Sequence, residues 1–385
     1  MSMTTARSSR LQDRSDGSRR SVVFHRCDQQ ARVTEHDLST KAHLARALAA
    51  LLDCDYAGEF DPGDRPNGKL YVVPSDTLLT PDETSSMDIA SLGDLFGGVV
   101  PHRFIATKVI THPLVSPDAA APAGWSTAFP ERVKSVVLPG FSVFSRDDAL
   151  RAGDLLLREG GVRLKDASGV GGLGQWVVSS RDELVERLQR ISPEVFAQQG
   201  MVVERNLASV DTHSVGQVQV GDWTITYCGM QYTTRNNRGN EVYGGSTLTV
   251  VRGDFEDLLR LDLDSPVRTA VEQALVYHRA ALKLFDGFYA SRSNYDIAQG
   301  VDEQGRACSG VLEQSWRIGG ASGAEIAALH AFKEDPELNV VRASTHEVYG
   351  SPVDIPAGAL VHYDGDDADV GPLTKFVRIA PYGRT

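Results

Sequence analysis

Residues 294–329 contain acids, a hydroxyl and an arginine at spacings that could hold a charged ligand. Asp296 ends one short strand-like run, and Glu313 ends the next, with Ser315 and Arg317 two and four residues further on. If the two runs are neighbouring strands, these polar side chains converge on one small volume. Two carboxylates beside a guanidinium could hold Mg²⁺ against a triphosphate. The alternative interpretation is a surface ion-pair network.

Residues 162–178 have the pattern of a β-hairpin with a glycine-rich turn. Lys165 ends the first strand-like run, and the turn contains Gly169, Gly171, Gly172 and Gly174. Glycine has no Cβ, so the turn backbone could approach an anion closely, and Lys165 would point at the same anion. The strand-to-helix phosphate loop GxxxxGK[ST] is absent. A merely flexible hairpin is the alternative.

Two later segments could contact a nucleotide or a substrate. Residues 201–207 form a short strand broken by charge, whose backbone could address an adenine edge while Glu204 touches ribose or amine; an ordinary strand end is the alternative. Residues 231–245 read as a loop whose side chains could clamp a substrate, although a solvated loop is equally compatible. The clamp candidates are Arg235, Asn236, Asn237, Arg238 and Asn240.

The elements that must position these residues follow an α/β pattern. Strand, helix and strand alternate before residue 105, and residues 103–114 read as a helical segment that carries Lys108. Residues 214–229 predict a second hairpin, and residues 265–285 a long amphipathic helix. We divide the chain as follows: 1–20 disordered tail, 21–105 small α/β lobe, 106–200 lobe with the glycine hairpin, and 201–385 lobe with the metal site and a C-terminal extension.

Composition excludes several classes of protein. The 385 residues carry a formal net charge of -12, so no overall field favours nucleic acid or an anionic membrane. No window approaches the roughly 20 apolar residues of a transmembrane helix. The four cysteines are scattered without a CxxC pair, which disfavours a zinc site and suits the reducing cytoplasm.

In the order of these motifs the chain resembles the ATP-grasp superfamily over roughly residues 100–325. The markers are Lys108, Lys165 with the glycine flap 169–174, Glu204, Asp296, and the run 313–317. That superfamily has the pattern acid-x-Asn-x-Arg on its last strand, where this chain has Ser315 in place of Asn. The phrases at 162–175 and 312–325 look like an uncharacterised family, a domain of unknown function from proteobacteria, near the ATP-grasp ligases.

The resemblance implies an ATP-grasp fold, in which two α+β lobes grip ATP after a small α/β lobe. It implies three groups of contacts. Lys108, Lys165 and the flap glycines would contact nucleotide phosphates, and Lys165 would also act in catalysis. Glu204 with Val202 and Val203 would lie along the edge of the adenine. Asp296, Glu313 and Ser315 would hold Mg²⁺, while Arg317 would stabilise the transferred phosphoryl group. A hydroxyl is a poorer ligand than an amide oxygen, so at Ser315 a water or Gln314 would substitute, or metal binding would be weak.

The function implied is an ATP- and Mg²⁺-dependent ligase of the carboxylate-amine type, in which the γ-phosphoryl group activates a carboxylate as an acyl-phosphate. Arg235 joins Arg317 and Lys165 as a candidate catalytic residue. The partners are then small-molecule carboxylates and amines, and the oligomeric state, a homodimer among the options, stays open. A small-molecule kinase of the same fold and a nucleotide-binding regulatory protein are the alternatives.

Overall fold

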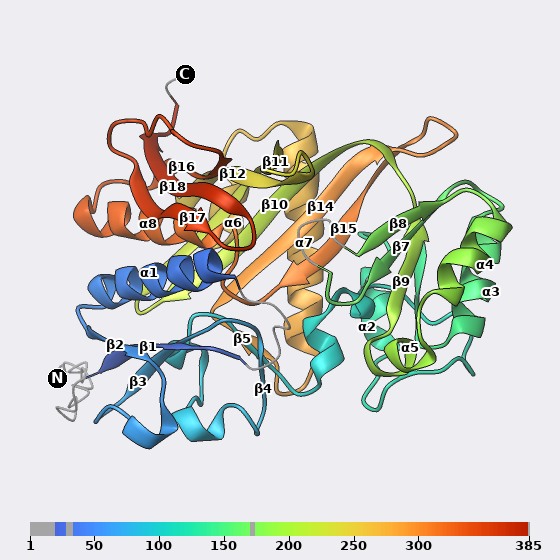
Figure 1. Ribbon diagram of the computed structural model, residues 1–385, viewed down its shortest axis with the longest axis horizontal. Helices are drawn as coiled ribbons and strands as arrows, with labels where there is room; N and C mark the ends of the chain where they lie inside the picture. Colours follow the sequence, from blue (N-terminus) through green and yellow to red (C-terminus); the bar gives the residue numbers. More distant parts are fainter. Residues whose placement is uncertain (1–19, 28–33, 170–173, 384–385) are drawn as a thin grey trace, which may run out of the picture.

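The computed structural model describes residues 20–27, 34–169 and 174–383, and it shows a mixed α/β protein with three parts (Figure 1). A small N-terminal lobe, a lobe built on a four-stranded sheet and a lobe built on an eight-stranded sheet follow one another along the chain. None of the described helices is long and apolar enough to cross a membrane.

The N-terminal lobe has a parallel sheet in the order β2-β1-β3. Val22, Val23 and Phe24 are all buried, as expected for a central parallel strand covered on both faces. A second small sheet, β13-β5-β4, joins this lobe to the later chain. The elements are β1 (Ser21–His25), α1 (Glu35–Leu51), β2 (Asp55–Glu59), η1 (Pro62–Asp64), β3 (Leu70–Pro74), β4 (Leu78–Leu79), η2 (Ser85–Met87), η3 (Leu92–Asp94), β5 (Gly98–Val100) and, from later in the chain, β13 (Tyr289–Ala290).

The segment predicted as a helix over 103–114 forms two 3₁₀ turns instead, η4 (Arg103–Ala106) and η5 (Lys108–Thr111). They are separated by Thr107, whose backbone is extended. The Gln314 side chain donates hydrogen bonds to the carbonyls of Ile105 and Thr107, at 3.1 and 2.7 Å. Because a distant strand takes these two carbonyls, an uninterrupted α-helix does not form here.

The middle lobe has an antiparallel sheet in the order β6-β9-β7-β8. The predicted glycine hairpin is confirmed, since β7 and β8 pair directly. β9 lies between β6 and β7, so this sheet continues past the boundary placed at residue 200. The elements are α2 (Ala128–Val133), β6 (Gly140–Val143), α3 (Arg146–Leu156), β7 (Val162–Asp166), β8 (Gln175–Val178), α4 (Arg181–Gln189), α5 (Pro193–Gln199) and β9 (Met201–Arg205).

The last lobe has an antiparallel sheet in the order β15-β14-β10-β11-β12-β16-β18-β17. The predicted hairpin over 214–229 is confirmed as β10 and β11. The predicted loop over 231–245 is wrong in extent, because cross-strand pairs continue to Arg235 and Glu241 and leave only residues 236–240 between the strands. The strands are β10 (Ala208–Val220), β11 (Trp223–Arg235), β12 (Glu241–Arg252), β14 (Arg292–Val301), β15 (Ala307–Ser315), β16 (Val340–Tyr349), β17 (Leu360–Asp367) and β18 (Gly371–Pro381); α6 (Phe255–Leu259) follows β12.

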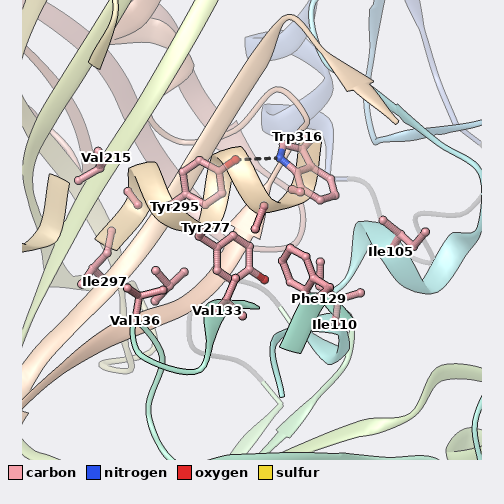
Figure 2. Close-up of a cluster of buried hydrophobic side chains, with 14 of the residues drawn as sticks. Ile105, Ile110, Phe129, Val133, Val136, Val215, Tyr277, Tyr295, Ile297 and Trp316 are labelled. Atoms are coloured by element: carbon pink, nitrogen blue, oxygen red, sulfur yellow. Dashed lines mark hydrogen bonds between the residues drawn. The ribbon is translucent and has the colours of Figure 1, made fainter. Parts of the chain in front are cut away.

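Helices cover both faces of this large sheet. α7 (Ser265–Leu284) packs on one face, where Tyr295 accepts a 3.4 Å hydrogen bond from Trp316 inside an aromatic core (Figure 2). α8 (Ser322–Glu334) and α1 pack on the other face. β17 also contacts α1, so the C-terminal strands return to the N-terminal helix (Figure 1). The arrangement agrees with the predicted ATP-grasp fold.

Candidate active site

The acids of the opening motif lie directly opposite each other on β14 and β15. Asp296 pairs with Glu313, and Asn294 pairs with Ser315. A β-bulge lies next to this acid pair on β15, since Ile297 pairs with Val311 and leaves Leu312 without a partner on β14. Side chains alternate along a strand, so the acids, Asn294 and Ser315 share one face, and the aromatic core of Figure 2 lies on the other.

The carboxylate pair suits a divalent cation. Burial and the neighbouring Glu313 carboxylate raise the pKa of Asp296 to about 7. A cation bound by both acids would offset the repulsion that adds to the effect of burial, and oxygen ligands are those that Mg²⁺ prefers. Asp296 Oδ1 accepts hydrogen bonds from Gln231, at 2.6 Å, and from Asn294, at 2.9 Å. The residues present therefore fit Mg²⁺.

Ser315 and Gln314 both have hydrogen-bond partners within the protein in the described arrangement. The Ser315 hydroxyl accepts a 3.3 Å hydrogen bond from Arg292. The Gln314 amide nitrogen is bound to two carbonyls near Lys108, and its oxygen accepts from Tyr277 at 3.1 Å. Gln314 thus lies on the opposite face of β15 and positions the η4–η5 segment, so the prediction that it could swing toward the metal is not supported.

Lys108 connects the acid pair to the glycine hairpin. Its ammonium lies 2.6 Å from Glu313 Oε2 and donates to the carbonyl of Gly169 at 2.5 Å. The lysine side chain is 3% exposed, whereas that of Glu313 is 29% exposed. Lys108, Gly169 and Glu313 all line the same cavity. A phosphate group in that cavity would compete with Glu313 for the ammonium.

Lys165 has a different partner. Its ammonium lies 2.5 Å from Glu204 Oε1, and His112 lies 3.2 Å from Glu204 Oε2, with all three side chains at most 2% exposed. Burial alone would raise the pKa of Glu204, but Lys165 and His112 outweigh it and lower that pKa to about 2. In this arrangement Glu204 is occupied by the lysine, and neither residue lines the cavity.

The structure does not support the predicted role of Val202 and Val203. β9 is paired on both edges, with β6 on one side and β7 on the other. The backbone N–H and C=O groups of a strand with two neighbours are already used in the sheet, so they cannot also address an adenine edge. The backbone leaves the sheet only after Arg205.

Two of the four flap glycines can be placed. Gly174 has φ +69°, and a Cβ there would lie 2.6 Å from Asp166 Oδ2, so a side chain at this position would be strained. Gly169 lies beside Lys108. Gly171 and Gly172 lie outside the described residues.

A cavity of about 730 Å³ extends from Glu313 and Lys108 toward the N-terminal and C-terminal parts of the chain. Three ion pairs line it away from the acid pair: Lys41 with Asp37 at 2.8 Å, Lys375 with Glu347 at 3.0 Å, and Arg317 with Asp76 at 3.7 Å. Burial raises the pKa of Asp37, yet Lys41, Lys375 and Arg317 together hold it below its usual range. The three cations therefore act on one region of the cavity.

Arg235, predicted to clamp a substrate, does not line this cavity. It is exposed, and the loop after it is bound elsewhere, since Asn237 donates to the carbonyls of Val370 and Pro372 and Arg238 to that of Asp369. Loop composition alone could not indicate where the loop would dock.

Sequence reasoning missed several residues of the site. A signal existed for Lys41, which occupies the apolar stripe formed by Leu44, Ala45 and Leu48 on α1. A signal also existed for Asn294, which precedes Asp296 by two positions and so must share its face. No local signal identifies Lys375 or His112, because their partners come from distant segments.

Several solved structures are similar in fold. N5-carboxyaminoimidazole synthetase from Staphylococcus aureus has a TM-score of 0.49 at 11% identity, covering 94% of both chains. Phosphoribosylamine–glycine ligase from Thermotoga maritima has a TM-score of 0.49 at 13% identity, covering 94% of this chain and 92% of that one. D-alanine–D-alanine ligase from Bacillus anthracis has a TM-score of 0.46 at 12% identity, covering 82% and 95%.

No curated protein matches the sequence. A family described as "Protein of unknown function (DUF3182)" matches residues 22–377, which is most of the chain. The site described above therefore sits inside the matched region, and the chain belongs to the DUF3182 family.

Proposed function

We propose that this protein is an ATP- and Mg²⁺-dependent ligase of the carboxylate-amine type. The observation that carries the proposal is one cavity with two kinds of wall. Lys108 and Glu313 line it near the strand ends, and the ion pairs of Lys41, Lys375 and Arg317 line it further away. The first set has the charges that a transferring phosphoryl group requires, and the second set suits a polar substrate beside it.

In the proposed reaction a substrate carboxylate oxygen attacks the γ-phosphorus of ATP, and ADP leaves. An amine then attacks the carbonyl carbon of the acyl-phosphate, inorganic phosphate leaves, and a proton is released from the nitrogen. Lys108 would hold phosphate oxygens, and Arg317 would neutralise charge on the transferred group. Asp296 and Glu313 would hold Mg²⁺, which supplies charge neutralisation to the phosphates.

The substrates that fit this cavity are small and charged. A volume of about 730 Å³ lies within the usual range of small-molecule sites. Its walls present cations and acids in pairs, so a molecule with an anionic group and an amino group can exchange partners with them without leaving a buried charge unpaired. Acidic or amino-bearing carboxylates are therefore the first candidates.

The test traps the acyl-phosphate. Purified protein is incubated with Mg²⁺-ATP, a panel of amino and carboxylic acids, and hydroxylamine in place of the amine, and ADP and acyl hydroxamate are measured. We expect carboxylate-dependent formation of both, with turnover lowered at least about a thousandfold, or about 4 kcal/mol, in Glu313→Gln. Glu256→Gln makes the same chemical change at an exposed site on α6 and serves as the matched control.

Three other results would contradict the proposal. A stable phosphorylated product without hydroxamate would indicate a kinase. Nucleotide binding without any ADP release across the panel would indicate a regulatory protein. Equal turnover in the Glu313→Gln and Glu256→Gln variants would remove the acid pair from the reaction.

A further inference from the structure

Asn294 occupies an unusual position beside the acid pair. It lies opposite Ser315 across the strands, two residues before Asp296, and is 7% exposed. Its amide nitrogen is 2.9 Å from Asp296 Oδ1. Its amide oxygen is 2.6 Å from the Ser214 hydroxyl and 2.8 Å from the Tyr227 hydroxyl. The amide thus lies between the candidate metal site and a buried polar network.

In this orientation the Tyr227 hydroxyl lies beside more acceptors than it has protons to donate. Its hydroxyl has one proton and lies within hydrogen-bond distance of two acceptors, Asn294 Oδ1 and, at 2.6 Å, Glu325 Oε1. Glu325 is ion-paired with Arg292 at 2.8 Å, and an ionised carboxylate can only accept. The proton therefore goes to Glu325, and two oxygens 2.8 Å apart have no proton between them.

Turning the Asn294 amide by 180° gives each of these contacts one donor and one acceptor. The NH₂ group then donates to the hydroxyls of Tyr227 and Ser214, and Tyr227 still donates to Glu325. The turn needs almost no change of shape, because the amide nitrogen and oxygen are nearly equal in size. It brings the amide oxygen to about the former position of the nitrogen, beside Asp296.

A cation is what makes that turned orientation favourable. An amide oxygen 2.9 Å from an ionised carboxylate oxygen repels it unless a positive charge lies between them. Two adjacent oxygen ligands of octahedral Mg²⁺, each about 2.0–2.1 Å from the metal, lie about 2.9 Å from each other. The present separation therefore suits two oxygens that share one magnesium ion.

We propose that the amide oxygen of Asn294 is a ligand of Mg²⁺ and takes the place of the amide that Ser315 lacks. This inference rests on the proposed function, because it assumes a metal at Asp296 and Glu313. Gln231 also donates to Asp296 but remains a donor, since none of its described hydrogen bonds requires its amide to turn.

The test measures Mn²⁺ affinity by electron paramagnetic resonance in the presence of a non-hydrolysable ATP analogue. Asn294→Ser should weaken Mn²⁺ binding at least about tenfold. The exchange Asn294→Ser with Ser315→Asn, which restores an amide on the facing strand, should recover most of the loss. Asn339→Ser makes the same change at an exposed position and is the matched control.

A second measurement uses the unaltered protein, so it does not depend on a variant folding. Asparagine labelled with ¹³C at the side-chain carbonyl should give a hyperfine coupling to bound Mn²⁺ of the size typical of a directly coordinated amide. Absence of that coupling in the Mn²⁺-loaded protein would overturn the proposal.

The outcomes separate this inference from the proposed function. If Glu313→Gln loses Mn²⁺ while Asn294→Ser binds it like the unaltered protein, only the role of Asn294 is wrong. Loss of affinity in Gln231→Ala but not in Asn294→Ser would likewise overturn it in favour of the other amide. If the unaltered protein does not bind Mn²⁺ with nucleotide at all, both proposals fail.

Discussion

Two of the described lysine–glutamate pairs, Lys165 with Glu204 and Lys108 with Glu313, look alike in the sequence and differ in their surroundings. Lys165 and Glu204 lie 2.5 Å apart with exposures of 2% and 1%, and His112 contacts the same carboxylate. Lys108 and Glu313 lie 2.6 Å apart, but the Glu313 side chain is 29% exposed and borders the cavity. The first pair is enclosed by protein, and the second can exchange partners with a ligand.

This difference assigns different tasks to the two lysines. Separating the enclosed pair would leave a charge without water or a partner, which is costly. The Lys108 pair can open at lower cost, because the carboxylate it releases reaches water or a metal ion. We therefore expect Lys108 to contact a phosphate group directly, and Lys165 mainly to hold β7, β9 and the η5 segment together unless a ligand displaces Glu204.

The largest effect should come from breaking the enclosed pair. Lys165→Met leaves Glu204 buried with only His112 beside it, so the free energy of unfolding should fall by about 3–5 kcal/mol. Lys108→Met is the matched comparison, and it should change that free energy by less than about 1 kcal/mol because Glu313 stays partly hydrated. Urea unfolding measures both. Equal losses would show that the two pairs are equivalent after all.

The second-largest effect should be a loss of stability at low pH from the same enclosed pair. The pKa of Glu204 falls from an ordinary value of 4.5 to about 2 in the folded protein, so its contribution to stability is complete above pH 4.5 and is lost as the pH falls through about 2. That shift corresponds to on the order of 3 kcal/mol. The stability difference between the unaltered protein and Glu204→Gln should therefore shrink over this range. A difference that stays constant from pH 7 to pH 2 would contradict the assignment.

The features predicted correctly from sequence are those with local periodic signals. The hairpins at 162–178 and 214–229 and the helix α7 follow from strand alternation, a turn and an apolar stripe. The opposition of Asp296 and Glu313 also follows, once β14 and β15 are taken as neighbours.

The features that sequence could not give depend on which distant segments meet. β9 has neighbours on both edges only because β6 and β7 enclose it, and this is what occupies the backbone of Val202 and Val203. The extension of β11 to Arg235 depends on its pairing with β12. Likewise, nothing near Lys165 in the chain indicates that Glu204, rather than a ligand, is its partner.

The smallest effect concerns the open pair and is measured in ligand affinity. Lys108→Met should weaken binding of a non-hydrolysable ATP analogue by about 1.5–3 kcal/mol, the usual contribution of a hydrogen bond to a charged group. Lys134→Met removes an exposed lysine that does not line the cavity and is the matched control. Isothermal titration calorimetry measures both affinities. If Lys108→Met binds the nucleotide as tightly as Lys134→Met does, Lys108 does not contact the phosphates.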